Sequence, residues 1–378
     1  MNWNVIRAMW FGWLVLILVS LAACLPRVRN VPTVTLSPTS NPTAAATSPK
    51  PSPTTESAQG RVTPAKNTQY GVLLPPGMAI ATQITVLQEL GVTFYRPAAF
   101  YMTSPDKPRP DIDTVAAAGH KIVLVVRASG ENGGVVSPPT DLSAYGRALQ
   151  GVLARYRPAY LVVEDEQDNQ KLFYSGTPQQ YLAELQVACQ AAREMAIPCV
   201  TGGFTPQTVI WLKVRDLLAR SQGEQALAYV QHTYPILFPD GSVPPLHSIA
   251  DLQRLVSQNA GILDRAQIML DGYPAAGADY LNFHWYAPDR EAITGAVEYL
   301  RQAGHGLTVL TDEIGQRDDN PDHTVAALST VRDLGLPLAV WFSVDIPQRN
   351  GAHALTEPDG KQRKTGDAFA RFMRSTGP

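Results

Sequence analysis

Acidic residues gather where a short apolar run ends. The run Tyr160–Val163 is rich in β-branched side chains, which is typical of a buried parallel strand. Directly after it come four acids within five residues, Glu164, Asp165, Glu166 and Asp168. Like charges repel, so the cluster lowers the stability of the fold, and a functional role would account for its presence. One such role is acid–base chemistry, in which one carboxyl group donates a proton while an ionised one attacks or activates water. The alternative is a solvated acidic loop.

Further polar and aromatic residues follow other apolar runs. They are Arg96, His284, Trp285, Tyr286, Asp312, Glu313 and Trp341. Two carboxylates on separate strands, with an arginine, a Tyr/His pair and aromatic rings, form a set that suits cleavage of a glycosidic bond. The faces of Trp285 and Trp341 can stack on the apolar face of a sugar ring.

Eight strand–helix pairs must position these residues. From Tyr70 onward, short β-branched runs alternate with amphipathic helical stretches. The expected strands lie near 70–74, 92–95, 121–126, 160–163, 199–202, 279–283, 307–310 and 337–341. The expected helices are 80–90, 112–118, 142–156, 178–195, 209–229, 290–303, 324–334 and 366–374. Helix-ending glycines stand before the next strand at Gly91, Gly119, Gly304 and Gly335.

This alternation predicts an α/β fold, a (β/α)₈ TIM barrel over residues 70–378, rather than an open doubly wound sheet. Open nucleotide-binding sheets carry a Gly-rich loop after the first strand, and LLPPGMAI at 73–80 is not one. The carboxyl ends of barrel strands form the functional face, so the residues named above should meet there. The stretch 231–273 is the least regular, and we expect a loop insertion over one barrel face.

Four segments resemble the clan A glycoside hydrolases, which are retaining enzymes on a (β/α)₈ barrel. AYLVVEDEQDN, ADYLNFHWYAP, LTVLTDEIG and LAVWFSVD look like strands four, six, seven and eight of that family. The resemblance extends through most of 70–378 as spaced short motifs. It implies that Glu166 is the acid/base and that Glu313, after strand seven, is the nucleophile.

The same resemblance implies roles for the neighbouring residues. Tyr286 would hydrogen-bond the nucleophile and orient it, and Arg96 would lie beside the nucleophile and keep it ionised. His284 would line the sugar site, and Trp341 would form its floor. The substrate would be a carbohydrate, and no cofactor or metal is implied.

The acid/base motif departs from the family pattern at two positions. Asp165 replaces the usual Asn, and Gln167 replaces the usual Pro. The Asn donates a hydrogen bond to the sugar 2-hydroxyl, whereas an ionised Asp can only accept one. Asp165 also adds a negative charge beside Glu166 and should raise its pKa, as a general acid requires. The change is compatible with an unusual sugar, or with a barrel that binds glycans without cleaving them.

Several assignments stay open on the residues alone. Glu164 competes with Glu166 for the acid role, and Asp312 competes with Glu313, because alternation along a strand does not decide between them. Other site residues could instead be structural: Arg96 could pair with a core acid, His284 could be a satisfied core histidine, and Trp341 could be a core residue. The cluster DDNPDH at 318–323 has metal-ligating residue types, but Asn-Pro-Asp before a helix is ordinary turn and capping chemistry.

The N-terminal region predicts export and anchoring. Residues 1–23 read as a signal peptide, with Arg7 before an apolar stretch. The segment ends in Leu-Ala-Ala-Cys24, which resembles the bacterial lipobox and implies lipidation of Cys24. Residues 24–69 contain no aromatic residue and are rich in Pro, Thr and Ser, so we expect a disordered tether. The prediction is an extracytoplasmic domain, lipid-anchored to the bacterial cell membrane at the cell surface or in the periplasm.

Composition excludes several classes. The formal net charge of −2 gives no excess of cations for binding nucleic acid. Three cysteines are too few for a disulfide scaffold. Cys189 and Cys199 could pair only if a helix and the next strand bring them close, and we expect buried free thiols. No HExxH, CxxC, GxSxG or Walker motif occurs, and we expect a monomer.

Overall fold

The structure is a computed structural model that describes residues 67–130, 134–238, 246–345 and 354–376. These residues fall in one compact unit. The expected signal peptide, Cys24 and nearly all of the tether lie outside the described residues. Within the described ranges, no helix has the length and apolar character needed to cross a membrane.

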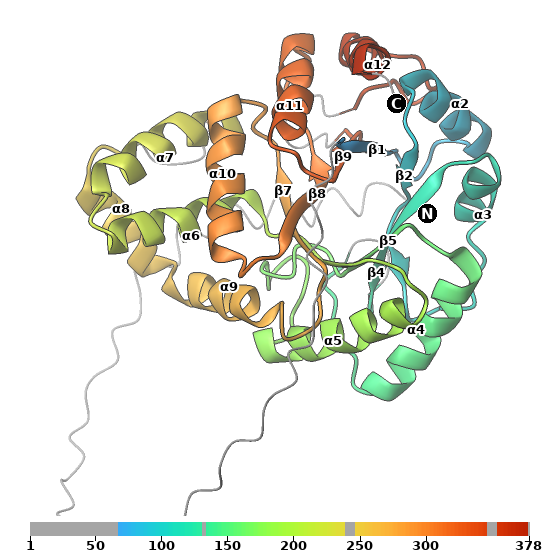
Figure 1. The fold of residues 1–378 in the computed structure, drawn as a ribbon, viewed down its shortest axis with the longest axis horizontal. Coiled ribbons are helices and arrows are strands. Elements are labelled where there is room, and N and C mark those ends of the chain that lie inside the picture. The colour runs from blue at the N-terminus through green and yellow to red at the C-terminus, as the bar shows by residue number, and fades with distance from the viewer. Residues whose placement is uncertain (1–66, 131–133, 239–245, 346–353, 377–378) are drawn as a thin grey trace, which may run out of the picture. The chain divides into compact units, whose positions relative to one another are not determined.

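Parallel strands form a closed barrel (Figure 1). The strands are β1 (Gln69–Leu73), β2 (Phe94–Arg96), β3 (Phe100–Tyr101), β4 (Lys121–Arg127), β5 (Tyr160–Val163), β6 (Cys199–Thr201), β7 (Tyr280–Trp285), β8 (Thr308–Ile314) and β9 (Leu338–Phe342). The sheet order is β2-β1-β9-β8-β7-β6-β5-β4-β3, and pairing of β2 with β4 closes the ring. Because β2 and β3 pair with opposite ends of β4, they share one barrel position. The predicted eight-stranded (β/α)₈ barrel is confirmed.

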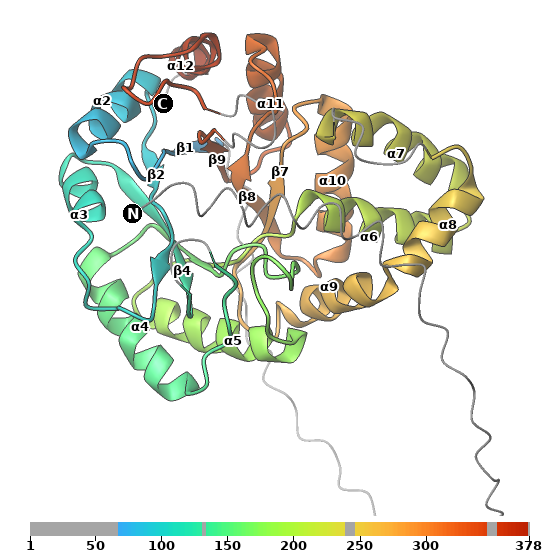
Figure 2. The same cartoon turned by 180° about the vertical axis from the view of Figure 1, so that it is seen from behind.

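Helices surround the strands, as the two opposite views show (Figures 1 and 2). They are α2 (Ile80–Leu90), α3 (Pro110–Ala117), α4 (Leu142–Tyr156), α5 (Pro178–Glu194), α6 (Pro206–Ala219), α7 (Gly223–Leu237), α8 (Ile249–Gln258), α9 (Ala260–Gly272), α10 (Arg290–Ala303), α11 (Pro321–Asp333) and α12 (Lys364–Thr376). Gly91 ends α2 at φ 73°, in the left-handed conformation that glycine adopts without strain.

Two expectations about the segment between β6 and β7 are wrong. The helix expected over 209–229 is broken into α6 and α7, with Ser221 at φ 62° between them. The stretch 231–273, expected to be the least regular and to carry a loop insertion, contains the end of α7 and all of α8 and α9, while residues 239–245 of the expected loop lie outside the described residues. A capping box between Ser248 and Asp251 starts α8. Four prolines between 235 and 245, all before this box, interrupt the helical pattern of the sequence.

The core has two layers that alternate along each strand. In β5, Tyr160 and Val162 belong to the cluster inside the barrel. Leu161 and Val163 pack outward with the helices. Side chains therefore fill the barrel interior, as expected for eight strands. A ligand can enter only at an end of the barrel, where the acidic motifs lie.

Cys189 of α5 and Cys199 of β6 form a disulfide, with an S–S distance of 2.01 Å and a Cα–Cα distance of 5.2 Å. The expectation of free thiols is wrong. The chain turns between the helix and the strand with Ala196 at φ 56°, and α5 packs directly on β6. This packing brings together two cysteines that are ten positions apart.

Candidate active site

The loop after β5 turns sharply at two acids. Glu164 has φ 66° and Glu166 has φ 43°, a left-handed conformation that is uncommon for residues other than glycine. The Glu166 N–H donates to the Gly202 carbonyl at 3.1 Å, and the Asn169 N–H donates to the Glu166 carbonyl at 2.9 Å. These bonds hold the turn, which points the side chains of Glu164 and Glu166 into different surroundings.

Glu164 is fully buried and faces β4 and α5. It accepts a hydrogen bond from the Ala128 N–H at 2.6 Å and lies 3.6 Å from Arg127 Nε. Burial raises its pKa to about 7, and burial together with Glu164 raises the pKa of the neighbouring Glu184 well above the usual value. Of the two acids that competed in the sequence, Glu166 is the one beside Glu313.

Asp312 and Glu313 are consecutive on β8, the seventh barrel strand, yet both reach the same cation. Arg96 Nε lies 2.9 Å from Asp312 Oδ2, and Arg96 Nη1 lies 2.9 Å from Glu313 Oε1. The registers of β8 with β7 and with β9 are both irregular at this point. Thr311 Oγ1 donates to the carbonyls of Phe283 and Glu313 and holds the irregularity. The interrupted register explains how neighbouring side chains face one site.

Arg96, at the end of β2, is a buried cation among three carboxylates. Besides Asp312 and Glu313, it lies 3.5 Å from Asp165 Oδ1. Burial lowers the pKa of Arg96, but the carboxylates raise it further, so the guanidinium stays charged. Burial raises the pKa of Asp312, but Arg96 and His284 lower it more strongly, and the resulting pKa is about 2. Asp312 is therefore ionised at neutral pH.

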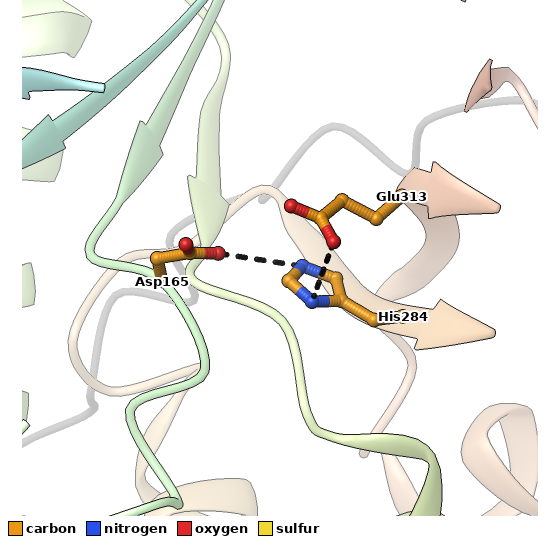
Figure 3. A group of neighbouring side chains, drawn as sticks. All are labelled: Asp165, His284 and Glu313. Atoms are coloured by element: carbon orange, nitrogen blue, oxygen red, sulfur yellow. Dashed lines mark ion pairs between the residues drawn. The ribbon is translucent and has the colours of Figure 1, made fainter. Parts of the chain in front are cut away.

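His284 of β7 lies between carboxylates of the loop after β5 and carboxylates of β8. Its Nδ1 lies 3.1 Å from Glu166 Oε1 and 3.5 Å from Glu313 Oε2. Its Nε2 lies 3.1 Å from Asp312 Oδ1 and 3.8 Å from Asp165 Oδ1. Figure 3 shows Asp165 and Glu313 approaching the ring from separate segments. Burial lowers the pKa of His284, but the surrounding acids raise it more strongly, so the resulting pKa lies well above the usual value. The ring is an imidazolium that donates at both nitrogens.

Gly203 lies against the His284 ring, and Asn282 holds Asp312, which in turn contacts the ring. Gly203 has φ 85°, and a Cβ there would lie 2.4 Å from His284 Nε2, so the close approach requires glycine. Asn282, two residues earlier on the same face of β7, donates to Asp312 Oδ1 at 2.5 Å and accepts from the Asp312 N–H at 3.0 Å. The sequence analysis missed Asn282, although its spacing from His284 in a strand was the available signal.

Glu166 and Glu313 differ in their surroundings. The Glu166 side chain is 14% exposed, and burial, Asp165 and Glu313 raise its pKa to about 7 against the lowering effect of His284. Glu313 accepts a short hydrogen bond from the Tyr286 hydroxyl. Burial raises the pKa of Glu313, while His284 and Arg96 oppose that rise.

The two tryptophans expected to stack on sugar are not at the site. Trp285 is fully buried, and its Nε1 donates to the Ala287 carbonyl at 3.0 Å. Trp341 is 1% exposed and packs edge-on against Phe369 of α12, with ring centroids 6.0 Å apart. Both side chains point from the barrel toward the helices, so these two predictions are wrong. Sequence spacing alone did not reveal which face of each strand is inward.

A cavity of about 480 Å³ adjoins Glu166 and Tyr286. Its walls come from the loop after β5, the start of α6, the first half of α9 and Arg317. It includes four residues that the sequence analysis missed: Phe173, Trp211, Arg265 and Arg317. They lie on loops and helices outside the strand-end motifs, where nothing in the sequence distinguished them from ordinary surface and core positions.

Three residues could in principle hold a metal ion. Asp165, His284 and Glu313 each offer one ligand atom, and these atoms lie within 4.8 Å of one another (Figure 3). Arg96 already lies between the two carboxylates of this set, 3.5 Å from Asp165 Oδ1 and 2.9 Å from Glu313 Oε1, so a protein cation occupies the position that would suit a metal ion.

The acidic cluster at 318–323 is a helix start. Asn320 accepts from the Asp322 N–H at 3.0 Å and caps α11, and His323 Nδ1 lies 2.8 Å from Asp318. These are the turn and capping contacts that the sequence suggested as the alternative to a metal site.

No family model and no curated protein sequence matches this chain. Solved structures do. A glucosidase from Croceicoccus marinus is 15% identical with a TM-score of 0.56, and the match covers 82% of this chain and 69% of that one. A GH39 β-xylosidase from Caulobacter crescentus is 15% identical with a TM-score of 0.51, covering 82% and 72%.

An exo-β-1,4-mannosidase from Opitutaceae bacterium strain TAV5 is 16% identical with a TM-score of 0.51. That match covers 82% of this chain, which spans 59% of the mannosidase. At these identities the similarity shows the fold alone. The chain has the (β/α)₈ barrel of these glycoside hydrolases, as the resemblance of its strand-end motifs predicted.

Proposed function

We propose that this chain is a retaining glycoside hydrolase that cleaves O-glycosidic bonds of an extracellular oligo- or polysaccharide. The observation that carries the proposal is the pair Glu166 and Glu313, from separate strand ends, that contact the same nitrogen of His284 at 3.1 and 3.5 Å. Their nearest oxygens cannot be farther apart than the sum of those distances. This upper limit of about 6.6 Å includes the roughly 5–5.5 Å of retaining enzymes and only just reaches the lower end of the roughly 6.5–9.5 Å range of inverting ones.

The reaction is a double displacement. Glu313 attacks the anomeric carbon and forms a covalent glycosyl-enzyme, while Glu166 gives its proton to the leaving oxygen. Glu166 then takes a proton from a water molecule, the water oxygen bonds to the anomeric carbon, and Glu313 leaves as a carboxylate. A pKa of about 7 supports Glu166 in both steps, because its protonated and ionised forms are both populated near neutral pH.

The neighbours support these roles. The Tyr286 hydroxyl and Arg96 both bind the Glu313 carboxylate and fix its orientation. Asp165 Oδ1 is buried without a hydrogen-bond partner among the described residues. The Asp165 carboxylate can accept a hydrogen bond from a sugar hydroxyl. It also carries a negative charge, which the neutral Asn of the family does not.

Activity screening tests the proposal. Aryl glycosides and polysaccharides are offered to the parent chain and to Glu313→Gln. The expected result is turnover of at least one glycoside with retention of anomeric configuration, reduced at least about 10³-fold in the variant. Inversion of configuration, or equal rates in the two proteins, would contradict it.

A second candidate is a tethered glycan-binding protein on a degenerate glycosidase barrel. The replacement of the family Asn and Pro by Asp165 and Gln167 favours it. Gln167 is buried and donates to the Tyr273 hydroxyl at 2.8 Å, so it has a structural place in the loop. Glycan binding without turnover in either the parent or Glu313→Gln would favour this candidate.

We further propose that the domain acts outside the cytoplasm, attached to the membrane through lipidated Cys24, with the Pro/Thr/Ser-rich segment as its tether. The Cys189–Cys199 disulfide supports an oxidising compartment. Cell fractionation tests the anchor. The parent chain should be in the membrane fraction and Cys24→Ala should not, and equal distribution of the two would contradict the proposal.

A further inference from the structure

We propose that the cavity beside Glu166 is a leaving-group subsite for an acidic sugar, one that carries a carboxylate or a sulfate. The inference rests on the proposed hydrolysis and adds the chemistry of the unit that departs. It depends on where the cavity lies, on a buried arginine without a counter-ion, and on the apolar surface around them.

The cavity lies on the acid side of the reaction. Glu166 and Tyr286 line it, whereas Glu313 and Arg96 do not. A general acid protonates the oxygen of the leaving group, so the unit that leaves lies on the side of that acid. A volume of about 480 Å³ falls within the range of small-molecule pockets and has room for a sugar ring.

Arg265 of α9 lines this cavity as a buried cation that has no ion pair with any described residue. It is 8% exposed. Its Nη2 donates to the Gln167 carbonyl at 3.1 Å, but its Nε has no hydrogen-bond partner. The acid that interacts with it electrostatically is Asp168, whose oxygens accept from the N–H and Oγ1 of Thr205. A buried charge without a close partner costs free energy, and an anion in the cavity would supply the partner.

Other groups add positive potential. Arg317 lies over the rings of Phe238 and Tyr286, at 5.5 and 5.9 Å from their centroids. Lys171 is exposed on the cavity wall. The first turn of the 14-residue helix α6 lines the cavity as well, and its dipole favours anions.

Two acids also face the cavity, but they do not cancel these charges. Glu166 must be protonated, and therefore neutral, when it acts as the acid. Asp168 is held by Thr205 at the start of α6. With Glu166 protonated, Arg265 and Lys171 share the cavity lining with one ionised carboxylate, that of Asp168.

Apolar groups favour a sugar over a bare anion. Trp211 is among the residues that line the cavity. Leu172 and Ile262, which also line it, are 44% and 51% exposed and are among the few large apolar side chains at the described surface. An aliphatic and aromatic wall beside a cation fits the apolar face of a pyranose that carries an acidic substituent.

Binding to full-length Glu313→Gln tests the subsite without turnover. The probes are glucuronate, N-acetylglucosamine 6-sulfate and their neutral parents, glucose and N-acetylglucosamine, titrated by calorimetry. We expect at least one acidic sugar to bind about tenfold more tightly than its neutral parent, with an advantage that falls as salt increases. The two acidic probes distinguish carboxylate from sulfate recognition. Equal binding of acidic and neutral sugars would overturn the proposal.

Further substitutions test which residues produce the preference for acidic sugars. Arg265→Met, added to the Glu313→Gln chain, should abolish the preference, and Arg290→Met, which removes an exposed arginine of α10, should leave it unchanged. Lys171→Gln, at an exposed position that folding does not require, should weaken acidic-sugar binding severalfold and leave neutral-sugar binding as it was. A preference that survives both Arg265→Met and Lys171→Gln would overturn the assignment.

The two proposals fail in different ways. A preference for acidic sugars in a parent chain that turns over no glycoside would support the acidic subsite and contradict only the hydrolase. Turnover of neutral glycosides with no preference for acidic sugars would support the hydrolase and contradict only the acidic subsite.

Discussion

His284 is the residue on which the chemistry of the site converges. It is buried as an imidazolium between Glu166 and Asp312, and it approaches Glu313 as well. Its charge lowers the pKa of both proposed catalytic acids, while burial raises them. Strand-end position in the sequence indicated that His284 belongs to the site. The acids that His284 bridges come from the loop after β5 and from β8, so the contacts could not be predicted from one strand.

The pH profile should depend on this bridge. Glu166 must be protonated to act as the acid, so kcat/KM should fall as pH rises through about 7. His284→Gln removes a positive charge that lowers the Glu166 pKa, so its descending limb should move to higher pH while activity drops at least about tenfold. Rates measured from pH 5 to 9 check both statements. A limb that stays in place in His284→Gln would contradict the bridging role.

Among the elements, β7 and β8 build most of the site because their register is irregular. The irregularity turns Asp312 and Glu313 toward one cation, a result that strict alternation would forbid. The loop after β6 contributes by bringing Gly203 close to His284. Periodicity in the sequence predicted these strands, but a bulge leaves no periodic signal.

Gly203→Ala tests the close approach. A Cβ would lie 2.4 Å from His284 Nε2, and φ is 85°. Gly119→Ala is the matched control, because Gly119 has φ 96° with no neighbour within 4 Å of a Cβ. Both should lose about 1 kcal/mol from backbone strain, but only Gly203→Ala should also lose activity, by at least about tenfold. Equal activity of the two variants would show that the His284 ring does not need this space.

The Cys189–Cys199 disulfide fastens α5 to β6, the strand that precedes the Gly203 loop. Closing a loop of about ten residues restricts the unfolded chain by roughly 2–3 kcal/mol. Cys189→Ala with Cys199→Ala should therefore lower the melting temperature by several degrees. A reducing agent should lower the melting temperature of the parent and leave that of the variant unchanged. A parent chain that is insensitive to reduction would contradict the assigned bond.

At the level of the whole molecule, strand–helix alternation was enough to predict the barrel and most element bounds. It failed at the disulfide, at the helices α8 and α9, and at the outward-facing Trp285 and Trp341, because periodicity does not show how elements pack against one another. The cavity residues Trp211 and Arg265 were missed for the same reason, since each becomes part of the site only through the packing of α6 and α9 around the loop after β5.

Stability should decline between mildly acidic and neutral pH. Glu164 and Glu166 have folded-state pKa values of about 7, above the usual 4.5. The folded chain therefore binds more protons than the unfolded chain between these values, so stability falls as pH rises from about 4.5 to about 7. Melting temperatures over this range check the slope. Burial also raises the pKa of Glu184 well above its usual value, so Glu184→Gln removes a further acid that binds a proton in the folded chain and should flatten the slope. A steeper slope in that variant would contradict the account.

Covalent trapping by a panel of 2-deoxy-2-fluoro glycosides with good leaving groups tests the central claim most directly. The fluorine slows hydrolysis of the glycosyl-enzyme, so the labelled residue can be identified by mass spectrometry of the digested chain. We predict a single label on the peptide that contains Glu313, absent from Glu313→Gln. A label on Asp312 or Glu166 would contradict the account, as would turnover of the parent glycoside with no label formed.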